Sequence, residues 1–155
     1  MLYLVQHGEA VSKEVDADRP LSAQGVADVS RLAAFLSAAG IQLDQVFHSG
    51  KTRAQQTAEI LASSIQEDLK IEQIAGINPN DPVDVFAGKL GEMHLPVMIV
   101  GHLPFMSRLV SHLLIHHDDP TIVAYQPGSV VCLEKDMNDA WSISWMLRPE
   151  LFVEK

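Results

Sequence analysis

Two histidines and one arginine stand where short apolar runs give way to polar sequence. His7 directly follows the apolar run 2–6, and His102 directly follows a second such run. Arg53 lies a few residues beyond the end of a third run. A neutral imidazole is a nucleophile near pH 7, and a guanidinium offers a planar fork of donors to an oxyanion. These residue types together predict a site for a phosphate group.

The runs 2–6 and 96–101 have the length and apolar character of buried strands, and residues 45–48 are a short strand candidate. Strands that are apolar on both faces are typical of parallel sheets. Because the carboxyl ends of parallel strands meet at one edge of a sheet, we expect His7 and His102 to lie close together. A helix is predicted to follow residues 45–48. Its first backbone N–H groups would point toward the same edge of the sheet, which favours a phosphate there.

The remaining elements complete an α/β pattern. Helices are predicted from Ser22, a capping residue, to Gly40, a suitable stop, and over about 51–65, 82–92 and 104–115. A brief strand is predicted at 71–74, and an antiparallel hairpin at 129–135 and 141–147, with Trp141 and Trp145 on one face of its last strand. We therefore expect a three-layer α/β/α sandwich whose sheet is mostly parallel and ends in an antiparallel hairpin.

Composition narrows the class of protein. A chain of 155 residues with 47% apolar and 20% charged residues is typical of one globular domain, here residues 1–155. A net charge of −9 argues against nucleic acid or an anionic membrane surface as the main partner. The single cysteine, Cys132, favours a reducing compartment, and no targeting or membrane-spanning segment is evident, so we expect a cytoplasmic protein.

Four motifs, in this order along the chain, resemble those of the histidine phosphatase superfamily, which has the phosphoglycerate mutase-like fold. They are Gln6-His7-Gly8, the segment Arg19 to Gly25, the segment Ser49 to Thr57, and Gly101-His102-Leu103-Pro104. The short chain and the second motif are similar in particular to the SixA-type phosphohistidine phosphatases. The resemblance covers nearly the whole chain.

The resemblance implies a role for each matching residue. His7 would be the nucleophile that accepts the phosphoryl group, and Arg53 would clamp its oxygens. His102 would be the second histidine of the pocket, and Arg19 a loop arginine that reaches the phosphate. Gly8 and Ser49 would also border the phosphate, although Ser49 could equally cap the following helix. The reaction implied is independent of metals and of any cofactor.

One position departs from the family pattern, which has arginine immediately before the nucleophilic histidine. This chain has Gln6 there, which can donate hydrogen bonds but carries no charge. Losing a charge-assisted contact costs about 1.5–3 kcal/mol, or one to two decades in rate if it acts in the transition state. Activity could be reduced, the substrate could differ, or the protein could bind without turnover.

Two carboxylate residues lie near these motifs in the sequence but do not match a residue of the family pattern. Asp81 is the most plausible carboxylate for a general acid, and the alternative is a turn residue before Pro82, as Asx residues often are. Glu9 follows Gly8 and is expected to be a solvated loop residue. His112 and His116 have a spacing seen in metal sites on helices, but no third ligand accompanies them, so no metal site is predicted.

The motifs lead to one hypothesis with two alternatives. The favoured function is hydrolysis of phosphohistidine on a phosphorelay or phosphocarrier protein, through a phospho-His7 intermediate. Few residues separate Arg53 from His102, which leaves little room for a lid and suits a protein surface. The alternatives are a phosphomonoesterase acting on a small molecule and a phosphate-binding regulatory module with catalysis weakened by Gln6.

Overall fold

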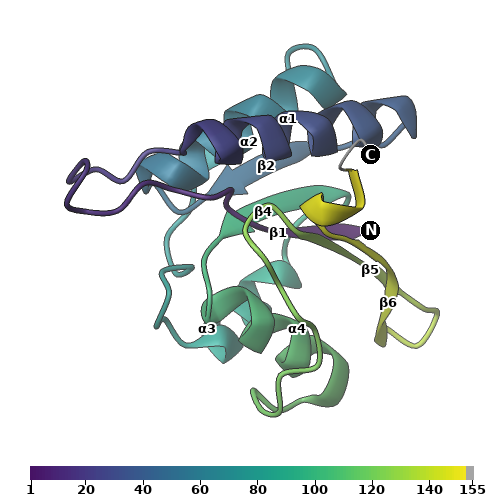
Figure 1. The fold of residues 1–155 in the computed structure, drawn as a ribbon. Coiled ribbons are helices and arrows are strands. Elements are labelled where there is room, and N and C mark those ends of the chain that lie inside the picture. Colours follow the sequence, from purple (N-terminus) through teal and green to yellow (C-terminus); the bar gives the residue numbers. More distant parts are fainter. Residues whose placement is uncertain (153–155) are drawn as a thin grey trace.

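A six-stranded sheet forms the centre of the computed structural model, which describes residues 1–152 (Figure 1). The strands are β1 Leu2–Gln6, β2 Gln45–His48, β3 Ile71–Gln73, β4 Val97–Gly101, β5 Val130–Lys135 and β6 Trp141–Leu147. Their order in the sheet is β3-β2-β4-β1-β5-β6, and β1, β2, β3 and β4 are parallel to one another. β5 pairs antiparallel with β1 and with β6. The predicted parallel sheet with a C-terminal antiparallel hairpin is confirmed.

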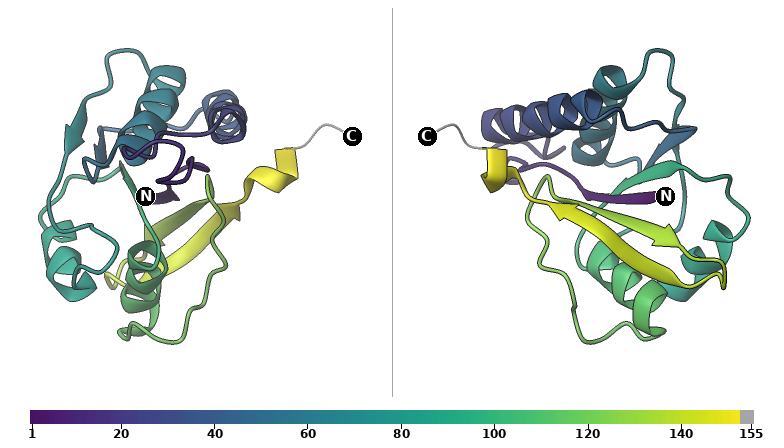
Figure 2. Two further views of the ribbon diagram at one scale, coloured as in Figure 1. Left: turned by 60° about the vertical axis from the view of Figure 1, so that its left-hand side comes forward. Right: turned by 90° about the vertical axis from the view of Figure 1, so that its right-hand side faces the viewer.

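Four helices cover the two faces of the sheet (Figures 1 and 2). They are α1 Ala23–Ala38, α2 Thr52–Ile65, α3 Val83–Leu90 and α4 Phe105–Ile115, and a short 3-10 turn, η1, follows at Pro149–Phe152. Side chains alternate along β1, so that Leu2 and Leu4 pack with α3 and α4 while Tyr3 and Val5 pack with α1 and α2. The three-layer sandwich is confirmed. Each described helix is too short or too polar to serve as a membrane span.

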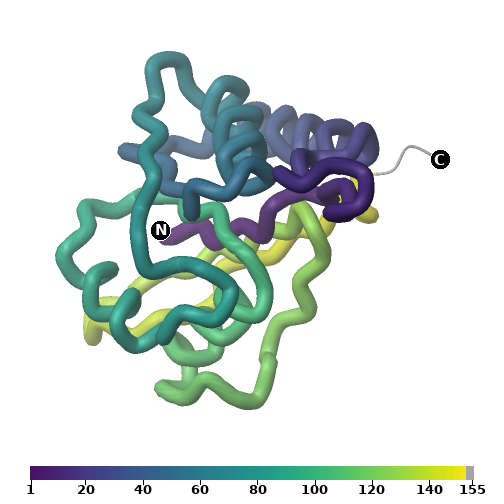
Figure 3. The backbone as a smooth tube through the Cα atoms, turned by 90° about the vertical axis from the view of Figure 1, so that its left-hand side faces the viewer, coloured from purple at the N-terminus to yellow at the C-terminus, as the bar shows by residue number. Residues whose placement is uncertain are grey.

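The loop between β1 and α1 folds back on itself at the edge of the sheet (dark purple in Figure 3). Val11 N–H donates to the carbonyl of Pro20, and Ser22 N–H donates to the carbonyl of Glu9. The Ser22 hydroxyl then accepts from Gly25 N–H at 3.0 Å, which is the cap that the sequence predicts for α1. α1 therefore begins directly against the backbone of this loop.

Two helix starts differ slightly from expectation. α2 begins at Thr52 with Lys51 as its N-cap residue, so Ser49 does not cap it. α3 begins at Val83, because Pro82 is itself the N-cap residue with an extended backbone and not the first helical residue. The helix ends at Leu90, two residues before the predicted end.

The expectation that Trp141 and Trp145 share a face is wrong. In β6, Trp145 is opposite Cys132, but Ile143 is opposite the next residue of β5, Leu133, which leaves Ser144 as an extra residue in a β-bulge. The bulge shifts the alternation by one residue. Trp145 therefore packs with the α1 and α2 side of the core, and Trp141 with the α3 and α4 side.

We predict that Gly25→Ala strongly destabilises the protein. A Cβ at this buried position would stand 2.0 Å from the carbonyl oxygen of Glu9, so α1 or the loop would have to move. We expect a loss of about 3 kcal/mol or more in the free energy of unfolding, measured by urea denaturation. The control Gly88→Ala lies in α3 with no neighbour within 4 Å and should stabilise by about 0.5–1 kcal/mol. Equal stability of the two variants would contradict this account.

Candidate active site

The carboxyl ends of β1, β2 and β4 bring His7, Ser49 and His102 to one edge of the sheet, as the sequence predicts. His7 N–H donates to the carbonyl of Gly101 at 3.0 Å, which continues the pairing of β1 with β4. The ring centroids of His7 and His102 are 5.0 Å apart, with the ring planes inclined by 52°. Two imidazoles that are 95 residues apart in the sequence therefore face one small region.

Two hydrogen bonds define the state of His7. Its Nδ1 lies 2.6 Å from the carbonyl oxygen of Gly8, which can only accept, so Nδ1 carries the proton. Arg53 Nε–H donates to His7 Nε2 at 3.3 Å, which requires a lone pair on Nε2. The pKa of His7 is lowered to about 4, chiefly by burial; the Gly8 carbonyl opposes this shift, and the charges of Arg53 and Arg19 add to it. His7 is thus a neutral imidazole with its proton on Nδ1 and its lone pair on Nε2.

His102 is the more deeply buried of the two, with 1% of its surface exposed. Its Nε2 lies 2.6 Å from the Ser49 hydroxyl, and its buried Nδ1 has no hydrogen-bond partner within residues 1–152. The pKa of His102 is lowered to about 3, chiefly by burial and to a smaller extent by His7, Arg53, Lys51 and Arg19. Of the two roles left open for Ser49, capping α2 is excluded, and contact with His102 takes its place.

Arg19 and Arg53 line a pocket of about 410 Å³, together with Lys13, Lys51 and backbone at the start of α2. Burial lowers the pKa of Arg53, and the nearby Arg19 lowers it further. Arg19 has a left-handed backbone, with φ +47°, and its Nε donates to the carbonyl of Val11 at 3.1 Å. This conformation costs a non-glycine residue about 1–2 kcal/mol, and here it aims a guanidinium from the loop toward Arg53.

Thr57 holds the backbone beside His7, a contact that the sequence did not reveal. Its hydroxyl is fully buried, accepts from Gly8 N–H at 3.0 Å and donates to the carbonyl of Arg53 at 2.8 Å. The neighbouring Gln56 accepts from Leu21 N–H at 2.7 Å. The helical spacing places Thr57 on the inner face of α2, one turn after Arg53. The sequence does not show that its hydroxyl contacts Gly8.

Gly8 and Gln6 flank the nucleophile in different ways. Both backbone groups of Gly8 are occupied, the N–H by Thr57 and the carbonyl by His7, and a Cβ there would lie 2.7 Å from Val29. Close packing against α1 is thus one reason for glycine. The Gln6 side chain is 7% exposed, and its Oε1 is buried without a partner among residues 1–152. A neutral amide therefore stands where the family pattern has a guanidinium.

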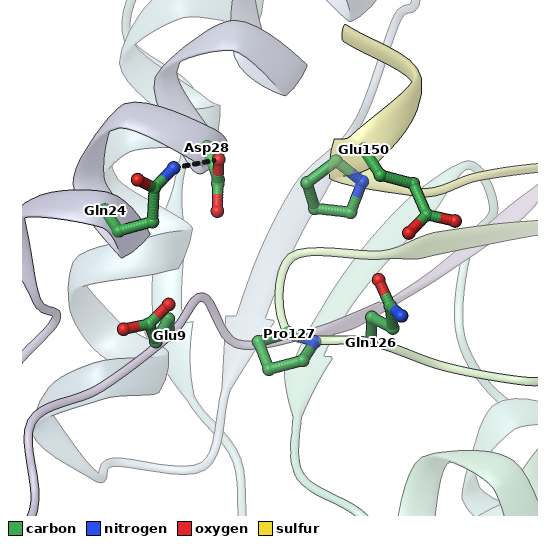
Figure 4. A pocket seen from close by; sticks show the side chains of 7 residues that line it. Glu9, Gln24, Asp28, Gln126, Pro127 and Glu150 are labelled. Carbon is green, nitrogen blue, oxygen red and sulfur yellow. Dashed lines mark hydrogen bonds between the residues drawn. The ribbon is translucent and has the colours of Figure 1, made fainter. Parts of the chain in front are cut away.

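The two carboxylates considered from the sequence lie in different surroundings. Asp81 accepts from Asn78 N–H at 2.8 Å within its own loop, and its role as a general acid stays a prediction. Glu9 accepts from the Ser22 hydroxyl at 3.2 Å and lines a separate pocket of about 270 Å³ with Gln24, Asp28 and Glu150 (Figure 4). Glu9 does not line the pocket of Arg19 and Arg53.

The histidines at the end of α4 do not form a ligand set. His112 Nδ1 lies 3.0 Å from the carboxylate of Asp118, and His116 has a left-handed backbone that ends the helix. Residues 1–152 hold no group of three or more His, Cys, Asp or Glu side chains placed for a metal ion.

Comparison with known proteins points to one family. Residues 2–78 match the family model of the histidine phosphatase superfamily (branch 1). The phosphohistidine phosphatase SixA of Escherichia coli (strain K12) is 22% identical over 153 residues, which cover 96% of this chain and 93% of the relative.

Solved structures agree with this match. A protein histidine phosphatase SixA complexed with tungstate superposes with a TM-score of 0.84 at 21% identity, covering 97% of both chains. The alpha-ribazole phosphatase from Shigella flexneri superposes with a TM-score of 0.76 at 19% identity, covering 99% of both chains. These structural matches confirm the expected phosphoglycerate mutase-like fold.

We predict that both active-site histidines stay neutral well below pH 6.5. In the unfolded chain each imidazole has a pKa near 6.5, whereas the folded values are about 4 for His7 and about 3 for His102. The unfolded chain therefore binds more protons as pH falls through 6.5, and the free energy of unfolding decreases from there toward pH 4. Nitrogen NMR should show His7 with its proton on Nδ1 at pH 7 and unprotonated Nε2 at pH 5.

Stability measurements provide an independent check of the same pKa values. Between pH 7 and pH 5, His7→Asn should lose less stability than the natural chain, because one of the two titrating groups is gone. A His7 titration midpoint near 6.5, or equal losses in the two proteins, would contradict the buried neutral state.

Proposed function

Because this chain belongs to the histidine phosphatase superfamily, we propose that it hydrolyses phosphohistidine through a phosphoryl group carried transiently on His7. One observation carries the proposal: His7 is held as the tautomer with a lone pair on Nε2, beside the Arg53 guanidinium and the His102 ring. This arrangement supplies a nucleophile, a cation and a second imidazole for one tetrahedral group.

The proposed reaction has two displacements on phosphorus. In the first, Nε2 of His7 attacks in line, the bond from phosphorus to the substrate imidazole breaks, and the leaving nitrogen takes a proton from water. Arg53, which donates to Nε2 in the resting site, turns its N–H groups to the phosphoryl oxygens, with Arg19 and His102 as further donors. In the second displacement, water attacks phospho-His7, releasing inorganic phosphate and restoring the neutral ring.

The bond to Gly8 serves both displacements. Nδ1–H donates to the Gly8 carbonyl while Nε2 forms its bond to phosphorus, and the positive charge that develops on the ring is stabilised by this acceptor. The Gly8 peptide is itself held by Thr57 from α2. The imidazole therefore keeps its orientation throughout, which favours in-line attack.

Two features favour a phosphohistidine over a phosphate ester. Within residues 1–152, no carboxylate hydrogen-bonds to His7, Arg53 or His102, and an imidazole leaving group needs less help from an acid than an alkoxide. In addition, the chain between Arg53 and His102 consists of α2, β3, α3, β4 and their connections, of which the longest, 74–82, has nine residues. A site without a lid insertion suits a phosphorylated protein surface, and the activity named for the Escherichia coli relative supports the same choice.

We predict that the natural chain dephosphorylates a histidine-phosphorylated carrier protein much faster than it hydrolyses p-nitrophenyl phosphate. His7→Ala should lower this rate by at least about a thousandfold, because no other group can form the covalent intermediate. His112→Ala is the matched control, since it removes an imidazole at the far end of α4, and it should retain the natural rate.

Each other outcome of this assay has a clear meaning. Faster turnover of the ester would favour the small-molecule phosphomonoesterase. Binding of the phosphorylated protein without turnover would favour the regulatory module, and full activity in His7→Ala would disprove the mechanism.

Gln6→Arg should raise kcat/KM for phosphohistidine by about ten- to a hundredfold, because it adds a charge-assisted donor beside the phosphoryl group. The control Gln42→Arg adds the same charge in an exposed loop and should leave the rate unchanged. Thermal unfolding of both variants checks that the buried position tolerates arginine. A well-folded Gln6→Arg protein with no gain in rate would show that the neutral amide suits this site.

A further inference from the structure

Some lysines and arginines of this chain form ion pairs with carboxylates, and others do not. Among the ten described in the structure, Arg31, Lys70, Lys135 and Arg148 each lie within 4.0 Å of a carboxylate. The six without a described carboxylate partner are Lys13, Arg19, Lys51, Arg53, Lys89 and Arg108, and the first four of these line one pocket. In a chain with 20 acidic and 11 basic residues, this is a marked local excess of positive charge.

Four cations line this pocket, which adjoins His7 through Arg53, although neither His7 nor His102 lines it. Arg53 donates to the nucleophile, and the charges of Arg53 and Arg19 both act on His7. The charge of Lys51 acts on His102. Lys13 is exposed, while Arg19, Lys51 and Arg53 are half-buried. The cations thus extend from the nucleophile outward to the surface.

The surroundings do not neutralise these charges. Asp18 is the one carboxylate residue that lines the pocket, and it lies within 4.0 Å of none of the four cations. In the separate pocket of Figure 4, by contrast, Asp28 is paired with Arg31 and Glu150 with Arg148. Like charges gathered without counter-charges repel one another, so an anionic group that entered the pocket would be bound favourably.

We propose that Lys13 and Lys51 form a second anion subsite, which binds an acidic side chain next to the phosphohistidine on the substrate protein. This inference rests on the proposed function, because it takes the substrate to be a phosphorylated protein. Arg53, Arg19 and the two histidines hold the phosphoryl group, and the lysines hold the neighbouring carboxylate. Glu9, the carboxylate of the separate pocket that has no cation partner among the described residues, disfavours an acidic group on that side and so orients the partner.

Binding of two synthetic peptides tests the subsite without requiring turnover. Both carry a non-hydrolysable triazole analogue of phosphohistidine, flanked on both sides by glutamates in one peptide and by glutamines in the other. Fluorescence anisotropy at low ionic strength should give a Kd about fivefold lower for the glutamate peptide, since each partly exposed ion pair contributes modestly. The preference should decrease as salt is added.

Variants of the full chain assign the preference to the two lysines. In Lys13→Gln/Lys51→Gln, the ratio of the two Kd values should fall to about one. The control Lys70→Gln/Lys89→Gln removes the same charge from outside the pocket and should keep the ratio of the natural chain.

Equal binding of the two peptides by the natural chain would overturn the subsite, as would loss of binding to both or an unchanged ratio in the Lys13 and Lys51 variant. A failure of the proposed function is seen separately, as absence of turnover of a histidine-phosphorylated protein. The subsite and the reaction can therefore fail independently.

Discussion

The neutral state of His7 is the condition on which the site depends. Its ring is held between an obligate acceptor, the Gly8 carbonyl, and an obligate donor, the Arg53 guanidinium. Only one tautomer satisfies both neighbours, and it leaves the lone pair on Nε2. Burial and the surrounding cations disfavour a proton there, so the nitrogen is available without a separate general base.

α2 connects this state to the packing of the domain. One helix carries Arg53, which contacts the nucleophile, and Thr57, which holds the Gly8 peptide. Gln56 ties the same helix to Leu21, next to the start of α1. The burial of Ala54, Ala58 and Leu61 thus fixes the geometry around His7 as well as the core, because the polar and apolar faces belong to one rigid element.

The elements and the ends of the strands were predictable because their causes are local. Alternation, helical spacing and the Ser22 cap are properties of neighbouring residues, and a parallel sheet brings His7 and His102 together by topology alone. The contacts of Ser49 and Thr57 were not predictable, because each joins a side chain to a partner about 50 residues away through tertiary packing. The bulge at Ser144 was missed for a related reason, since pairing with β5 reveals it and the β6 sequence alone does not.

Because Gln6 is neutral, the positive charge of the site is unevenly distributed. With a neutral amide at the end of β1, the remaining cations all come from the loop after β1 and from the start of α2. In the proposed function, a phosphoryl group at His7 would meet these cations on the side of Arg19, Lys51 and Arg53. A substrate with further negative charge would gain from approaching on that side. Because Gln6 adds no charge, we expect the affinity for the substrate to depend more on the groups that surround the phosphoryl group than it would with an arginine at this position.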